Sequence, residues 1–169
     1  WIMGPITLSH MDASISADHT KDWEVNVERY ARSHNYQYST RDEDLTYNPD
    51  NEVVGTSILQ RVFDVKNKSK DMEAVVGAIK SIKETLVKLD ADIARRVYRN
   101  QFRSADRKDI SLVYPFESWT RFENSNGLPP NFATAYDKIN GKGSWQKNVV
   151  KVLDNHTDGW YDEIRVMIK

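Results

Sequence analysis

The chain contains no cysteine. This absence excludes disulfides, thiolate metal sites and a cysteine nucleophile within these 169 residues. It leaves the cellular compartment open, because exported proteins can also lack cysteine. Long apolar runs are missing as well, and none approaches the ~20 residues that span a bilayer. We therefore expect a soluble protein.

An excess of charge of one sign is also lacking. The chain has 24 basic and 25 acidic side chains, which gives a formal net charge of -1. Such a balance provides no global attraction to nucleic acid or to an anionic membrane, so we expect neither as a partner. Hydrophobic residues make up 39% of the chain, including 5 Trp, 8 Tyr and 5 Phe, which is enough for a folded core.

The first residue is Trp1, without an initiating methionine or a signal peptide before it. Trp1 already lies inside a short apolar segment of strand type. We interpret this start as a sign that an upstream segment has been removed by processing, proteolysis or the choice of chain ends. Export with loss of such a segment is compatible with the sequence.

The clearest structural pattern is an amphipathic helix from Ser69 to Asp90. Its apolar side chains recur at helical spacing, while lysines and glutamates occupy the other side. Ser69 is suited to cap the first turn, and Asp71 would lie near the positive end of the helix dipole. The apolar set is Met72, Val75, Val76, Ile79, Ile82, Leu86 and Leu89.

From residue 52 to residue 169, the pattern predicts strand, helix, strand, strand, helix, strand. The strands are expected at 53–65, 97–102, 110–114 and 160–168, and helical segments cover 69–90, 131–139 and 144–153. This is the order of a ferredoxin-like β-α-β-β-α-β unit, an α+β fold. Residues 52–169 are therefore predicted to form one complete unit.

Residues 1–51 predict only strand, helix, strand, which equals the second half of such a unit. A shift of 122 positions, the difference between 23 and 145, superposes Trp23 on Trp145 and His34 on His156. The turn-forming residues from Tyr47 to Asn51 mark the boundary. We interpret the chain as a tandem repeat, with a partial β-α-β copy at 1–51 before the complete unit.

Three segments resemble uncharacterised tandem members of the dimeric α/β-barrel superfamily: Trp1–Pro5, Asp22–Glu24 and Asp44–Tyr47. In that superfamily two ferredoxin-like units pack sheet against sheet. The resemblance implies an α/β barrel, formed within one chain or by a homodimer. The superfamily includes antibiotic-biosynthesis-type monooxygenases, haem-degrading enzymes, stress-response barrels and NIPSNAP-like proteins, so membership does not select an activity.

Three arginines fall on one face of the strand predicted near residues 97–102: Arg95, Arg99 and Arg103. Side chains alternate with period two along a strand, so the three share that face with Val97. If it lines the space between packed sheets, the guanidinium groups can hold a carboxylate or another anionic ligand. Arg99 and Arg103 are therefore candidate ligand-binding residues.

The last strand carries a similar polar row formed by Tyr161, Glu163 and Arg165. These three residues are further candidates for binding a small-molecule ligand. The structural alternative for both rows is a solvent-facing or edge row whose charges deter aggregation.

No catalytic or metal-binding constellation is evident. The four histidines, His10, His19, His34 and His156, do not form pairs with metal-ligand spacing. His34 and His156 lie near the ends of predicted helices, where a structural role with free carbonyls is expected. The chain also lacks a Gly-rich phosphate loop and a nucleophile elbow. We predict no catalytic residues, no metal and no cofactor.

The interpretation that these observations favour is a small-molecule-binding or interaction protein built as an α/β barrel. The alternative is a cofactor-independent or haem-dependent monooxygenase-like enzyme acting on an aromatic or apolar substrate inside the barrel. A third reading is a purely structural dimer module with a solid interior.

Overall fold

A computed structural model describes residues 21, 24–26, 37–48, 57–102, 108–125 and 127–166. The chain divides into two compact units, residues 1–36 and residues 37–169. In the first unit only Lys21 and residues 24–26 are described, and they are helical. The rest of the description concerns the second unit.

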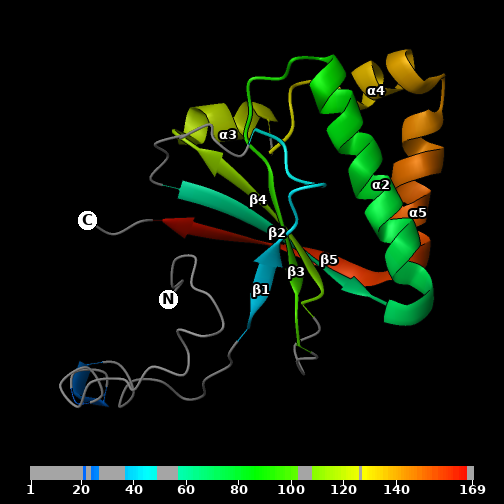
Figure 1. The fold of residues 1–169 in the computed structure, drawn as a ribbon. Helices are drawn as coiled ribbons and strands as arrows, with labels where there is room; N and C mark the ends of the chain where they lie inside the picture. The colour runs from blue at the N-terminus through cyan, green and yellow to red at the C-terminus, as the bar shows by residue number, and fades with distance from the viewer. Residues whose placement is uncertain are drawn as a thin grey trace. The chain divides into compact units, whose positions relative to one another are not determined.

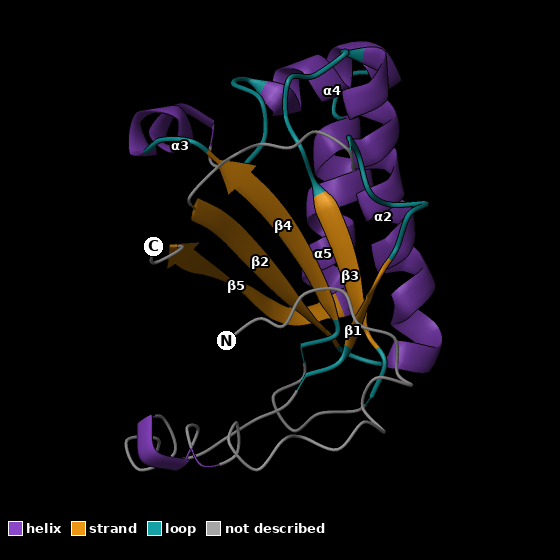
Figure 2. Cartoon of the chain, turned by 60° about the vertical axis from the view of Figure 1, so that its left-hand side comes forward, coloured by secondary structure: helices purple, strands orange, loops and turns teal. Residues whose placement is uncertain are grey.

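The second unit is built on one five-stranded antiparallel sheet with the strand order β1-β3-β4-β2-β5 (Figure 2). Each neighbouring pair of strands is antiparallel. The strands are β1 (Ser39–Arg41), β2 (Ser57–Val65), β3 (Arg96–Asn100), β4 (Ile110–Phe116) and β5 (Thr157–Val166).

One face of this sheet is covered by helices, with α2 and α5 lying side by side over it (Figure 1). The helices are α2 (Lys68–Lys88), α3 (Trp119–Ser125), α4 (Phe132–Asn140) and α5 (Lys151–His156). A π-helical turn, η3 (Gln146–Val150), runs directly into α5.

The long helix α2 presents an apolar stripe to the sheet, as its spacing predicts. Val75 and Ile79 are fully buried in the main core cluster together with Leu59 of β2 and Val97 of β3. Helix α2 begins at Lys68, one residue before the predicted start, and its N-cap is Asn67. The Asn67 side chain accepts a hydrogen bond from the Ser69 backbone N–H at 3.1 Å. An N-cap side chain accepts a hydrogen bond from the backbone N–H two or three residues later in the chain. Asn67 meets this requirement by bonding to Ser69, so Asn67 is the N-cap and Ser69 is not.

A second apolar cluster lies beyond the main core, between the C-terminal half of α2 and the helices that follow β4. It is formed by Ile82 and Leu86 of α2, Phe132 and Tyr136 of α4, and Val149 of η3. The Tyr136 hydroxyl also lies 2.8 Å from the Ser81 hydroxyl of α2. These contacts fix α4 and η3 against α2.

The opposite face of the sheet carries no helix among the described residues, and we call it the helix-free face. Because side chains alternate along a strand, the neighbours of the core residues on β2 to β5 point to it. The register fixes which of them share this face. They include Gln60, Val62, Arg96, Tyr98, Ser111, Val113, Tyr161, Glu163 and Arg165.

The predicted order of strand, helix, strand, strand, helix, strand is found from β2 to β5, with α3, α4, η3 and α5 in the second helical position. The predicted barrel, however, is not closed in the described part of the chain. Closure requires the edge strands to pair, whereas β1 and β5 lie at opposite edges of one open sheet. One sheet with helices on one face would need a second sheet to enclose an interior.

The second strand predicted within residues 1–51 corresponds to β1, which pairs with β3 and joins the same sheet as β2, β4 and β5. Of the helix predicted before this strand, only Lys21 and residues 24–26 are described, and Trp23 and His34 lie outside the described residues. The repeat and the boundary between 1–51 and 52–169 therefore stay predictions.

Candidate functional site

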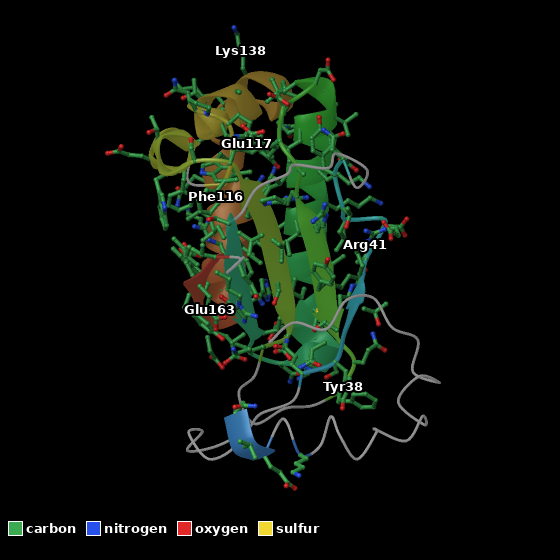
Figure 3. All side chains as sticks on the ribbon, turned by 90° about the vertical axis from the view of Figure 1, so that its left-hand side faces the viewer. Tyr38, Arg41, Phe116, Glu117, Lys138 and Glu163 are labelled. Carbon is green, nitrogen blue, oxygen red and sulfur yellow. The ribbon has the colours of Figure 1, made fainter. Side chains whose placement is uncertain are left out.

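The polar row of the last strand lies on the helix-free face. In the register of β5 with β2, Tyr161 is opposite Val62, Glu163 is opposite Gln60, and Arg165 is opposite Ile58. Figure 3 shows Glu163 and Arg41 on the two opposite edges of the sheet. The structure therefore places Tyr161, Glu163 and Arg165 together, as their alternation predicts.

Glu163 is the centre of this row because two cations share its carboxylate. Lys108 Nζ donates to Oε1 at 3.0 Å, and Arg165 Nη2 donates to Oε2 at 2.5 Å. The Lys108 ammonium also lies 5.5 Å from the centre of the Tyr161 ring. Together, Lys108, Glu163 and Arg165 carry one net positive charge.

The protonation of this cluster follows from burial and hydrogen bonds acting in opposite directions. Burial raises the pKa of Glu163, but the hydrogen bonds from Arg165 and Lys108 outweigh it and hold the pKa below its ordinary value. Burial lowers the pKa of Lys108, but Tyr161 and Glu163 outweigh it and raise the pKa above its ordinary value. Glu163 and Lys108 are therefore both charged at neutral pH.

The centre of the helix-free face adds buried polar groups beside this cluster. Gln60 and Ser111 are buried, and the Gln60 amide donates to the Ser111 hydroxyl at 3.2 Å. Arg96 is opposite Val113 in the register, and its Nε is buried without an acceptor. The face thus presents guanidinium and ammonium donors around hydrogen-bonding groups, an arrangement suited to an anion.

The other candidate row is separated from this face. Val97, which lies between Arg95 and Arg99, packs in the core with α2, so both arginines lie on the helix-covered side. Arg99 forms an ion pair with Asp42 there. Arg103 lies outside the described residues. Arg95 and Arg99 therefore do not line the helix-free face.

Arg95 is fully buried and ties two segments to each other. Its Nη2 donates to the backbone carbonyls of Leu45, at 3.1 Å, and of Ile79 in α2, at 3.0 Å. Its Nε and Nη1 have no acceptor. Burial lowers the pKa of Arg95, and the neighbouring Tyr114 only partly opposes this effect. These contacts give Arg95 a structural role in attaching the segment before β2 to α2.

A bidentate ion pair lies on the helix-covered side near the edge formed by β5. Arg61 Nε and Nη2 each donate to the Asp162 carboxylate at 2.8 Å. The Arg61 guanidinium carbon also lies 4.6 Å from the centre of the Trp160 ring. This pair joins residues that are directly opposite each other in the register of β2 with β5.

The one histidine in the described part of the chain, His156, is the last residue of α5. Its Nδ1 lies 2.8 Å from the Asp71 carboxylate in the first turn of α2. The helix-end position matches the prediction, but the partner is a carboxylate and not a free carbonyl. Within the residues that the structure describes, no group of three His, Asp or Glu side chains could hold a metal ion.

Comparison of the chain with protein-family models, with curated proteins and with solved structures finds no match. The resemblance to the dimeric α/β-barrel superfamily therefore remains an expectation from the sequence. No helix in the described ranges has the length and apolar character needed to cross a membrane.

Sequence reasoning missed Lys108, Gln60 and Arg96 as members of the helix-free face. Lys108 and Gln60 lie far from Glu163 in the chain, and only the register of β2 with β4 and β5 brings them together. For Arg96, the sequence pattern does contain a signal. Period-two alternation places it with Tyr98 on the face opposite the apolar Val97.

Proposed function

We propose that this chain is a small-molecule-binding protein and that its ligand carries a carboxylate or a comparable anion. The ligand lies on the helix-free face, beside Lys108, Glu163 and Arg165. The observation that carries this proposal is the sharing of one carboxylate, Glu163, by two cations on a sheet face without a described helix. The single negative charge of Glu163 balances only one of the two cations, so one positive charge of Lys108 and Arg165 is left without a counter-ion in this cluster.

The geometry of the cations favours a planar anion. An arginine presents several N–H groups in one plane, so Arg165 can keep its bond to Glu163 and still donate to a ligand carboxylate. Arg96 adds a further guanidinium group to the same face. Tyr98 and Tyr161 supply flat rings there, which favours a ligand with an aromatic or other flat apolar part.

For the fold we propose a ferredoxin-like unit. Support comes from the order β3-β4-β2-β5, with helical connections after β2 and after β4 and all neighbours antiparallel. The position of β1 beside β3 supports the further proposal of a preceding partial copy. In an α/β barrel formed within one chain, a second sheet would cover the helix-free face and enclose the ligand.

Titration with benzoate, followed by ¹H–¹⁵N correlation spectra, tests the proposed function. Benzoate should shift the amide signals of β5 and β4, whereas benzylamine, which has the same ring and the opposite charge, should not. The Arg165→Met variant should weaken benzoate binding about ten- to hundredfold, because a hydrogen bond to a charged group contributes roughly 1.5–3 kcal/mol.

The matched control is Arg99→Met, which removes an arginine from the helix-covered side of the same sheet and should leave benzoate binding unchanged. Equal shifts with benzoate and benzylamine would contradict the proposal. So would an Arg99→Met variant that weakens binding as much as Arg165→Met does.

A further inference from the structure

No described strand pairs with the outer edge of β5. Strand β5 has ten residues, bonds to β2 along one side, and ends the strand order. Four large side chains along it are exposed: Trp160 by 54%, Tyr161 by 41%, Ile164 by 41% and Val166 by 55%. A long edge with apolar side chains is a template for another strand.

The other edge of the sheet is protected in the ordinary way. Strand β1 has three residues, Ser39–Arg41, all polar and exposed. A short polar strand with a charged residue offers little for a further strand to pair with. Of the two edges, β5 is therefore the one that is open to a further strand.

We propose that β5 pairs antiparallel with β5 of a second copy of this chain, about a two-fold axis that passes through Ile164. The two sheets then join edge to edge into one continuous sheet. A two-fold interface uses the same surface on both copies, and a single strand that is self-complementary satisfies this requirement.

The charges of β5 select this register. With the axis at Ile164, Glu163 lies opposite the partner's Arg165, and the same pair recurs on the other side of the axis. An axis at Asp162 or at Glu163 would instead place two identical carboxylates directly opposite each other, which is destabilising. An axis at Tyr161 would place no opposite charges together. Only the Ile164 register, among these, pairs opposite charges.

The same register covers the exposed apolar side chains next to the axis. Ile164 meets the partner's Ile164, and Val166 lies opposite the partner's Asp162. The unpaired backbone groups of residues 162–166 gain partners in both copies. Removal of exposed apolar area and pairing of the edge both favour the dimer.

A cross-linking test gives an unambiguous result in this chain, because it contains no cysteine and any disulfide must come from an introduced residue. Directly opposite residues have Cα atoms about 4.5–5.5 Å apart, which a disulfide can span. The Ile164→Cys variant should therefore give a covalent dimer under mild oxidation. In Val166→Cys the two introduced residues would be four positions apart, roughly 13 Å, and should not cross-link.

Charge reversal gives an independent readout by light scattering on a size-exclusion column. Glu163→Arg and Arg165→Glu should each raise the dimer dissociation constant about tenfold, because each creates two like-charge pairs. The double variant with both substitutions restores opposite charges and should restore the dimer. A monomeric wild-type chain would overturn the proposal, and so would a dimer that neither cross-links at position 164 nor responds to charge reversal.

Discussion

Gly127 lies against the ring of Tyr114 so closely that no side chain fits between them. A Cβ atom built at Gly127 would lie 2.9 Å from Tyr114 Cγ and 3.2 Å from Leu59 Cδ2. Both neighbours belong to buried strands of the sheet, so neither can move aside cheaply. The loop between α3 and α4 is thereby held against the core by a glycine.

The first prediction follows from this contact. Gly127→Ala should lower the free energy of unfolding by about 2–4 kcal/mol, because both the clash and a backbone φ of +86° oppose the new side chain. Gly141→Ala is the control, since its φ is +103° but a Cβ there meets nothing within 4 Å. It should cost about 1–2 kcal/mol from the backbone alone. Urea denaturation measures the free energy of unfolding of both variants. Equal losses would show that the contact with Tyr114 does not contribute to the cost at Gly127.

The second prediction concerns the buried guanidinium of Arg95. Arg95→Ala should lower the free energy of unfolding by about 3 kcal/mol or more, since two hydrogen bonds to carbonyls are lost and a cavity remains. Arg95→Met should recover part of this loss, because its side chain refills the space that Ala leaves empty. Arg41→Ala, in an exposed pair with Glu43, should change stability by less than about 1 kcal/mol. Equal effects at the two positions would contradict the structural role of Arg95.

The third prediction concerns Asp109, a buried acid that joins β2 to the start of α2. It accepts a hydrogen bond from the Val65 backbone N–H at 2.9 Å and lies 2.5 Å from Lys68 Nζ. Asp109→Asn should lower the free energy of unfolding by about 1–3 kcal/mol, measured in urea. Lys68→Met should cost less, because the lysine is partly exposed and the backbone bond to Asp109 survives. A larger loss in Lys68→Met would refute this order.

The fourth prediction is an acid-dependent loss of stability at the contact between α2 and α5. The hydrogen bond with His156 is the main reason that the pKa of Asp71 is lowered. A group with a lowered folded-state pKa stabilises the fold above its unfolded pKa, and this contribution is lost as the pH falls through the folded value. Asp71 should therefore contribute at neutral pH and lose its contribution below about pH 4.

Thermal unfolding of the wild type and of Asp71→Asn from pH 7 to pH 2 measures this effect. The two melting temperatures should differ at neutral pH and converge in acid. His156→Gln should show the same convergence as Asp71→Asn, because it removes the partner. If the difference between the two melting temperatures stays constant down to pH 2, the ionised Asp71 is excluded as the cause of that difference.

The sequence predicted the order of elements from β2 to β5 because each signal is local. The helical spacing of Val75, Ile79, Ile82 and Leu86 and the alternation in β5 depend only on near neighbours in the chain. The N-cap was misplaced by two residues because Asn67 and Ser69 are both capable caps. The backbone decides which of them precedes the first turn.

The sequence predicts which side chains of one strand share a face of the candidate site, but it does not predict the contacts between side chains of different strands. Alternation alone puts Tyr161, Glu163 and Arg165 on one face. The partnership of Glu163 with Lys108 depends on strand register and on side-chain reach, which no local pattern encodes. Alternation also puts Arg99 on the face of Val97, and the packing of Val97 against α2 makes this the helix-covered face.

The π-helical turn η3 also determines how the last helix meets the sheet. A π turn holds one residue more than an α turn, and each residue advances a helix by about 100°. Removing one residue from Gln146–Val150 would therefore swing the whole of α5 by roughly that angle about its own axis. Leu153 would leave the core, and His156 would point away from Asp71. The extra residue thus sets the rotation of α5 about its own axis, and this rotation directs Leu153 and His156 toward the rest of the fold.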